Sequence, residues 1–357
     1  MTKSKSQKPE ARSNWFFNHP YQIIFLVCIL LHAQILTFGL VHFDDHGFVL
    51  MAADNLKLSN IPKFFNHSVF WVLGDTTQDT DVFYRPLQNV LYAICNTISP
   101  KNPWSYHFMG LCFHILASCL LFNFFKELKY HSSVALVFAL IYSVHPVLVQ
   151  GTAWIAGIGD QMATVFCLLS AIYFLKSFGA NVKAGFILFH LLFFVCALFS
   201  KEVSIALIPL CLFWFFVLNK NKANKNLFVS AVGWILIAVV YFIFRSNAIH
   251  SAKTSLIASA LESFKVNAPL VLEYFEKMFL PYRLSPIPSR EDAQFIVGGI
   301  VLLSLIALFV FRKRFTKMSL FGALWFVVFL FPLSFSKIRR RIFLRLSTDF
   351  IYRSSEF

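Results

Sequence analysis

Charged residues are scarce in this chain, at 14% of its 357 residues, whereas 58% are hydrophobic. A water-soluble domain of this length needs a larger polar fraction to cover a single core. The shortage of charge therefore excludes a soluble globular protein and favours a chain whose apolar surface faces lipid.

The chain is also poor in features of secreted or repeat proteins. Its seven cysteines lie inside apolar or helix-like runs, so we expect small buried hydrophobes rather than a disulfide framework. No repeat period of a helical array is evident. The first apolar run is too long for the core of a cleavable signal peptide, which predicts an uncleaved anchor.

Long hydrophobic runs are abundant instead, and nine are long enough to approach a hydrocarbon core of about 30 Å. They predict an all-α polytopic membrane protein, a bundle of about nine transmembrane helices. The runs lie at 21–41, 104–125, 133–150, 161–176, 184–200, 203–219, 227–244, 293–311 and 318–336.

Basic residues concentrate in the first twenty residues and in every second connection, which the positive-inside rule makes cytoplasmic. Residues 1–20 are thus a cytoplasmic arm, and 21–336 form the membrane domain. Most carboxylates fall in the opposite, external connections. The net charge of +15 fits topology and contact with anionic membrane lipids better than nucleic-acid binding. We expect a multi-pass protein of a bacterial plasma membrane, or of the ER membrane in a eukaryote.

Two external stretches are too short or too polar to cross the membrane. In the first external loop, 42–103, Phe48 to Leu58 and Pro86 to Ile98 have the helical period of interfacial helices. The second stretch, 245–292, contains Phe264 to Leu280, which we interpret as interfacial or re-entrant.

An acidic pair, Asp44 and Asp45 in HFDDHGF, follows the first run closely. Carboxylates near lipid are costly, which favours a function. One could accept a proton while the other orients substrate, although Asp also caps helix starts. His42 and His46 flank the pair, so the four side chains are candidate ligands of a divalent cation; no other cofactor is expected.

Other polar residues sit at the predicted external ends. Arg85 in YRPL could bind a phosphate or pair with Asp79 or Asp81. His107 and His114 share one helix face, which fits packing or a lined cavity. Further candidates, each with a turn, cap or solvated-end alternative, are His145 before Pro146, Asp160 after TAWIAGIG, and Lys201 with Glu202.

In this order, FDD, YRPL, H-x6-H, HPVLVQGTAWIAGIGD and SKE resemble the GT-C glycosyltransferases over roughly residues 21–336. The nearest likeness is to the transmembrane O-mannosyltransferases that carry tetratricopeptide repeats, and to their shorter bacterial relatives. The resemblance implies transfer of a mannose-like hexose from a polyprenyl-phosphate donor to a protein, lipid or glycan hydroxyl on the external face.

The resemblance also implies roles for individual residues. Asp44 or Asp45 would be catalytic, and Arg85, His145 and Lys201 would line the donor side. The supporting positions would be Tyr84, His107, His114, Asp160 and Glu202.

This chain departs from the family pattern at Gly110, Gln150 and Ile158, where relatives have asparagine, glutamate and arginine, and it lacks the repeats. The basic tail at 337–357 is atypical and suggests a truncated or frame-shifted product. Two alternatives therefore remain beside the enzyme: a transporter or flippase for a lipid-linked or anionic solute, and a catalytically dead relative.

Overall fold

The computed structural model describes residues 18–41, 44–74, 83–179, 182–183, 185–219, 224–249, 270–282, 284, 295–311 and 316–334. Throughout these ranges the regular structure is helical, without a strand. The prediction of an all-α membrane protein is confirmed. His42, Asp79, Asp81, the basic arm up to residue 17 and the tail at 337–357 lie outside the described residues.

Four helical segments are long and apolar enough to cross a membrane. They are α2 (Pro20–His32) with the 3₁₀ turn η1 (Ala33–Thr37), α5 (Trp104–Glu127), α8 (Ile158–Lys176) with η8 (Ile155–Gly157), and α11 (Lys225–Ala248). Shorter apolar helices occupy four other predicted runs: α9 (Gly185–Ser200), α10 (Leu207–Phe213) between η9 (Glu202–Ala206) and η10 (Trp214–Leu218), α14 (Phe295–Phe311) and α15 (Lys317–Ser334). The described residues thus support four spans, or five with a bent pair, and the count of about nine is not confirmed.

The bent pair replaces the single helix predicted at 133–150. Helix α6 (Ser132–Val144) ends before Pro146, and η7 (Pro146–Leu148) with α7 (Val149–Ala153) continues at an angle of 55°. His145 is extended, with φ −70° and ψ 118°. Proline lacks an N–H and disfavours a helical residue before it, which explains the break.

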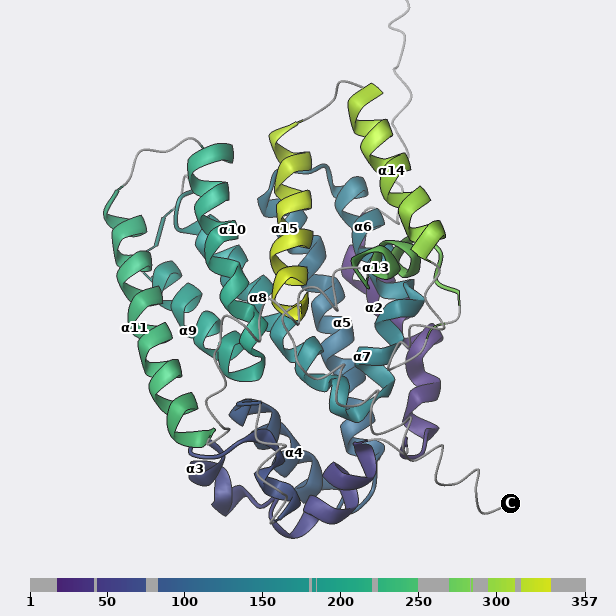
Figure 1. The fold of residues 1–357 in the computed structure, drawn as a ribbon, viewed down its shortest axis with the longest axis vertical. Helices are drawn as coiled ribbons and strands as arrows, with labels where there is room; N and C mark the ends of the chain where they lie inside the picture. The colour runs from purple at the N-terminus through teal and green to yellow at the C-terminus, as the bar shows by residue number, and fades with distance from the viewer. Residues whose placement is uncertain are drawn as a thin grey trace, which may run out of the picture.

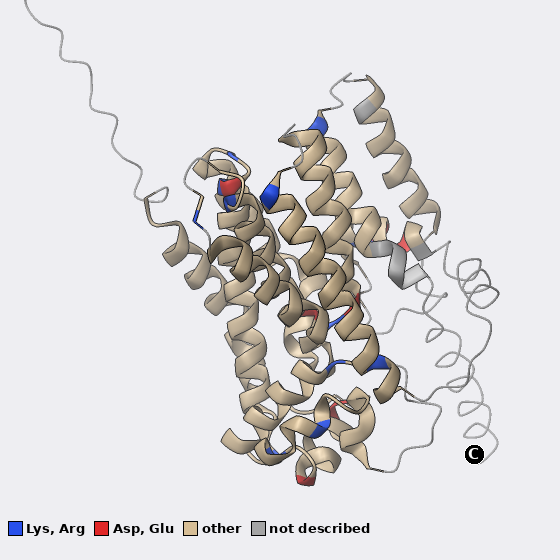
Figure 2. Ribbon diagram, turned by 90° about the vertical axis from the view of Figure 1, so that its left-hand side faces the viewer, with Lys and Arg blue, Asp and Glu red and all other residues tan. Residues whose placement is uncertain are grey.

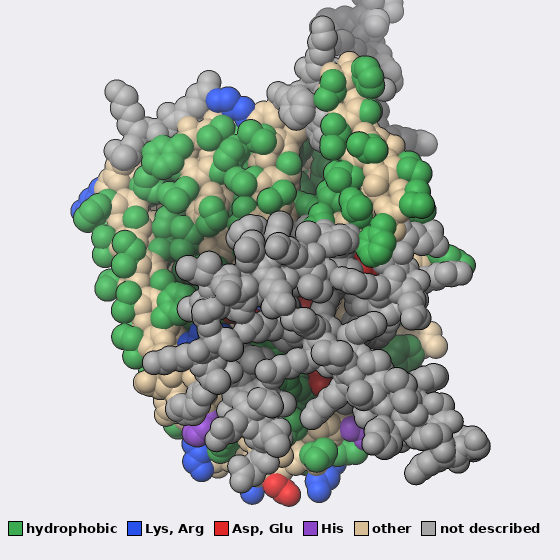
Figure 3. Space-filling model, viewed as in Figure 1, with side chains coloured by type: hydrophobic (Ala, Val, Ile, Leu, Met, Phe, Trp, Pro, Cys, Tyr) green, Lys and Arg blue, Asp and Glu red, His purple; other side chains and the backbone are tan. Residues whose placement is uncertain are grey.

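The bundle centres on α8, which packs against α5 and α9 (Figure 1). Phe174, Phe194 and Phe215 are fully buried in the core that α8 shares with its neighbours. By contrast, hydrophobic side chains cover the outer faces of α11, α15 and α14 (Figure 3). Apolar side chains on the outside as well as the inside are expected where the surrounding solvent is lipid.

The loop at 42–103, predicted to be external, forms a separate layer at one end of the bundle in its described part (Figure 1). It contains the π turn η2 (Gly47–Met51), η3 (Ala52–Asp54), η4 (Leu58–Asn60), α3 (Ile61–Phe64), η5 (Val69–Leu73) and α4 (Pro86–Ile98). Helix α4 has the predicted bounds, whereas the predicted helix over 48–58 is a series of short turns. A buried cluster around Phe48, Leu56 and Tyr92 fastens the loop to the bundle.

The stretch at 245–292, also predicted to be external, contributes α13 (Leu270–Phe279), which lies within the predicted segment from Phe264 to Leu280. The preceding part of that segment, 264–269, lies outside the described residues. Helix α13 packs mainly against α14. Its Phe275 also contacts Phe326 of α15, with ring centroids 4.8 Å apart.

Candidate functional site

Asp45 is fully buried and holds the first loop against η8. One of its carboxylate oxygens accepts a hydrogen bond from the backbone N–H of Ala156 at 3.2 Å, and the other accepts one from Val41 at 3.3 Å. Burial raises the pKa of this carboxyl, although the backbone N–H groups oppose the shift. With both oxygens engaged, Asp45 is suited to positioning the chain.

Asp44 has the opposite environment, because its side chain is exposed next to the buried Asp45. Desolvation by the surrounding chain nevertheless raises the pKa of Asp44. A carboxylate with a raised pKa and an open face can accept a proton from an incoming hydroxyl. The two adjacent aspartates therefore differ in what they can do.

A divalent cation would need more ligands than this pair offers. Within the described parts of the chain, no group of three or more His, Cys, Asp or Glu side chains is assembled. The oxygens of Asp45 are already used by backbone N–H groups, and His42 lies outside the described residues. The described residues alone therefore do not assemble a cation site, and the site that includes His42 stays a prediction.

Helix α4 carries two polar side chains that also bond to the backbone of η8. The amide nitrogen of Gln88 donates to the Tyr92 hydroxyl at 2.8 Å and to the Ala156 carbonyl at 3.3 Å. Tyr92 donates to the carbonyl of Ile155 at 2.9 Å. Sequence reasoning missed both residues. Their spacing of four on an amphipathic helix was the available signal.

Arg85, the residue before α4, forms a bidentate ion pair with Glu202 of η9. Its Nε and one terminal nitrogen donate to the two carboxylate oxygens at 3.0 and 2.8 Å. Burial alone would raise the pKa of Glu202, but the guanidinium of Arg85 outweighs it and lowers that pKa to about 2. The structure therefore joins two of the predicted site residues that are 117 positions apart.

A second ion pair lies directly beside the first. Lys201, which precedes Glu202 in sequence, pairs with Asp160 in the first turn of α8. The Lys201 side chain is only 15% exposed, whereas that of Asp160 is 58% exposed. Figure 2 shows how sparse charged positions are along the helices, with most of them near helix ends and in connections. Arg85, Asp160, Lys201 and Glu202 thus form one cluster of two cations and two carboxylates.

Tyr84, the residue before Arg85, holds this part of the chain in place. Its buried hydroxyl donates to the carbonyl of Phe65 at 2.8 Å, and its ring packs against Phe199 and Tyr241. The residue fixes the start of α4, and so the position of Arg85, against the ends of α9 and α11.

His114 belongs to a different group, deeper in the bundle. His114 of α5 and His32 of α2 both donate through Nε2 to the carbonyl of Ser143, at 3.1 and 2.9 Å. This carbonyl is released by the break after α6, because the N–H of Val147 bonds to His145 instead. His32 was missed, since a lone histidine in an apolar run gives little signal.

His107 is also buried, two turns from His114, with Gly110 between them. A Cβ at Gly110 would lie 2.7 Å from the Thr152 carbonyl of α7. The packing of α5 against α7 therefore leaves no room at this position for the asparagine that the resemblance leads one to expect. Both histidines serve the packing of α5 in the described structure, and neither reaches the ion-pair cluster through a contact described in the structure.

An apolar cavity of about 760 Å³ opens between α5, α6, α8 and α15. Asp160, Val203 and Met278 line it at the end where the ion pairs lie, and Leu128, Tyr130 and Met318 line it near the opposite helix ends. Among the described residues that line it, Asp160 is the charged one. The cavity is therefore a long apolar space that ends at a charged cluster.

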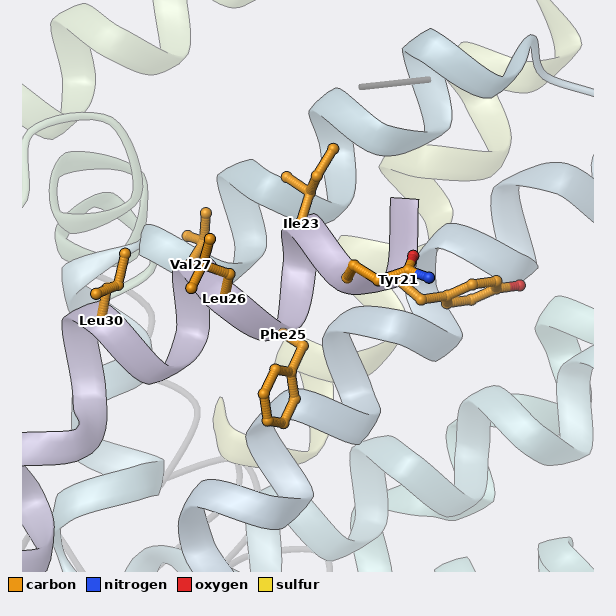
Figure 4. A pocket seen from close by; sticks show the side chains of 7 residues that line it. Tyr21, Ile23, Phe25, Leu26, Val27 and Leu30 are labelled. Atoms are coloured by element: carbon orange, nitrogen blue, oxygen red, sulfur yellow. The ribbon is translucent and has the colours of Figure 1, made fainter. Parts of the chain in front are cut away.

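A second concave surface lies along α2 and is lined by Tyr21, Ile23, Phe25, Leu26, Val27 and Leu30 together with Gln22 (Figure 4). All of these residues come from one helix. The surface has no charged lining residue among the described ones and carries no site chemistry.

Comparison with known proteins identifies similar mannosyltransferases. No family model and no solved structure matches the chain. It is 26% identical over 167 residues to human protein O-mannosyl-transferase TMTC1, which is 44% of this chain and 19% of that protein. It is 30% identical over 113 residues to mouse TMTC2, and 20% identical over 257 residues to mouse TMTC3, which covers 70% of this chain and 27% of that protein.

The resemblance to the O-mannosyltransferases, first inferred from motif order, is thus confirmed. The chain spans about a quarter or less of the length of these three relatives. The chain is thus similar to glycosyltransferases. Its own apolar helices make it a multi-pass membrane protein.

Proposed function

We propose that this chain transfers a mannose-like hexose from a polyprenyl-phosphate donor to a hydroxyl group at the external face of the membrane. The observation that carries the proposal is the apolar cavity that ends at the Lys201–Asp160 ion pair beside Arg85 and Glu202. A lipid phosphate has the same division into an apolar chain and an anionic head. The names of the relatives, protein O-mannosyl-transferases, favour a protein acceptor.

In the proposed complex the prenyl chain occupies the cavity and the phosphate lies next to Lys201 and Arg85. Both cations now pair with carboxylates, so the phosphate must share or displace these partners. The planar guanidinium of Arg85 suits a bidentate phosphate contact, whereas the Lys201 ammonium acts as a point charge.

The transfer needs one base and one charge-stabilised leaving group. The acceptor oxygen attacks the anomeric carbon of the hexose while its proton passes to Asp44. The bond between the anomeric carbon and the phosphate oxygen breaks, and polyprenyl phosphate leaves with the bonding electron pair. Lys201 and Arg85 offset the developing negative charge. Asp45 keeps its neighbour in place through Val41 and Ala156.

The test measures mannose transfer from polyprenyl-phosphate mannose to acceptor peptides, with the full chain in membranes. Asp44→Asn removes the base and is expected to lower the rate by about 10²–10⁴. Asp54→Asn changes another exposed aspartate of the same loop and serves as the matched control. Full activity of Asp44→Asn would contradict the proposed base.

The pH profile supplies an independent check on Asp44. Because its pKa is raised, the base loses its activity as the pH falls through a value above the ordinary 3.8. A transporter would instead move the lipid-linked sugar across the membrane without forming a glycosylated product. Transport without product in the wild-type chain would replace the enzyme with that alternative.

A further inference from the structure

The geometry points to α13 as the wall that closes the external mouth of the cavity, with Met278 as a contact for the isoprene units nearest the phosphate and His145 as the residue that positions it. This inference rests on the proposed function, because it names the part of the donor that α13 touches. It adds Met278, for which neither the motif order nor the relatives suggested a role, and it gives His145 a positioning role through α13 in place of the direct donor contact that the resemblance implies.

Met278 faces the cavity from α13. It lines the cavity together with Asp160, in the first turn of α8, and Val203, two residues after Lys201. Met278 therefore lies at the charged end of the cavity. The side chain is partly exposed, as expected for a lining residue of an open space. Methionine is flexible and polarisable, which suits contact with a mobile hydrocarbon chain.

A single side chain ties α13 to the break between α6 and α7. The Nδ1 atom of His145 accepts the N–H of Val147 at 3.3 Å, so in the neutral ring the proton is on Nε2. That nitrogen lies 2.9 Å from the carbonyl oxygen of Met278 and donates to it. Both ring nitrogens are occupied, and His145 acts on the donor through α13 as a positioning residue.

Two further contacts seat the same helix. Phe275 packs against Phe326, which lines the cavity from α15. Gly298 of α14 has no room for a Cβ, because the backbone of Leu272 passes directly over it. Apolar packing and a close backbone approach therefore hold α13 on one side, and the His145 hydrogen bond holds the end that carries Met278.

Cysteine probes test this arrangement without requiring sugar transfer. Met278→Cys reports on the α13 wall, and Gly322→Cys reports on the α15 side of the cavity, where a Cβ meets no atom within 4 Å. Met51→Cys, at an exposed position of the first loop, is the control. The full chain is alkylated with N-ethylmaleimide, with and without polyprenyl phosphate, and each modified peptide is measured by mass spectrometry.

We expect polyprenyl phosphate to slow alkylation at 278 and 322 about fivefold, because pockets bury about 70–90% of a bound ligand, and to leave position 51 unchanged. His145→Asn retains an oxygen that can cap η7 but cannot reach Met278. Added to Met278→Cys, it should abolish the protection at 278. Added to Gly322→Cys, it should leave the protection at 322.

The outcomes separate the two proposals. Protection at 322 without protection at 278 overturns the role of α13 and leaves the donor cavity standing. Protection at 278 that survives His145→Asn overturns the positioning role of His145. Absence of protection at both positions overturns the donor cavity itself, and with it the inference about α13.

Discussion

The charged cluster and the apolar cavity meet at Asp160, yet they are built in different ways. Each charge of the cluster is held by an opposite charge from a different element, as Arg85 is by Glu202. The cavity wall opposite is formed by α15 and α13, whose described contacts are mainly apolar and aromatic packing, with the His145 hydrogen bond at the end that carries Met278. The stability of the charged cluster therefore depends on the geometry of its ion pairs, whereas that of the cavity wall depends on the volume of the side chains that form it.

The difference has an energetic consequence. Removing one member of a buried ion pair leaves a charge without compensation, which costs far more than the pair itself contributes. An open apolar wall has no such liability, because a small change in volume can be absorbed where space is available. We therefore expect the two regions to respond to substitution with different magnitudes.

The largest effect on stability is expected from Arg85→Met, which strands the carboxylate of Glu202. The loss should be about 2–3 kcal/mol, below the 3–5 kcal/mol typical of fully buried pairs, because Glu202 is one-third exposed. Thermal unfolding in detergent measures it. The double variant Arg85→Met with Glu202→Leu should recover most of the stability but not the transfer activity. A double variant as unstable as the single one would contradict a stranded charge.

The next largest effect concerns two glycines, one in the tight α5–α7 contact and one in the wall of the open cavity. Gly110→Ala brings a Cβ to 2.7 Å from the Thr152 carbonyl and should cost about 2 kcal/mol through overpacking. Gly322→Ala adds the same methyl group in the open cavity and should unfold at or slightly above the wild-type temperature, because alanine favours a helix over glycine. Equal midpoints for the two variants would show that the α5–α7 contact is no tighter than the cavity wall.

A smaller effect is expected at the Ser143 carbonyl, which His32 and His114 share. Each single change to leucine should cost about 1 kcal/mol, because the other imidazole still satisfies the carbonyl. The double change leaves a buried acceptor unpaired and should cost more than the sum. Strict additivity in a double-mutant cycle would mean that the two histidines do not act on one group.

The smallest effect is expected from mild acid. The folded-state pKa of Glu202 is about 2, below its ordinary 4.5, so its stabilising contribution is complete above 4.5 and is lost as the pH falls toward 2. The unfolding temperature difference between the wild type and Glu202→Gln should therefore stay constant from pH 7 to about 5 and shrink below that. A difference that shrinks already at pH 6 would exclude this carboxylate as its source.

Local features of the fold could be predicted from the sequence. Pro86 at a helix start and the amphipathic period after it gave the bounds of α4. The break at His145 was readable from Pro146, but the apolar run continued across it and concealed the bend. The shorter helices α9 and α10 show that hydrophobicity predicts where a helix lies in the sequence, but not how long the helix is.

The candidate site was predictable only in part, because its contacts join distant segments. Motif order brought Arg85, Asp160, Lys201 and Glu202 together as candidates, but their pairing depends on how α4, α8 and η9 pack. The distinction between Asp44 and Asp45 also needed the structure, since adjacent aspartates have the same chemistry until one is buried. Gln88 and His32 act through backbone carbonyls, which leave no pattern in the sequence.

The pairing within the charged cluster also determines how an anion can approach it. Two cations and two carboxylates sum to zero, so the cluster projects little field into the surrounding water. A dissolved phosphate is not drawn in from a distance, whereas an anion tethered to a hydrocarbon chain arrives laterally from the bilayer. Its association rate should then depend little on ionic strength, because no long-range attraction is present for salt to screen.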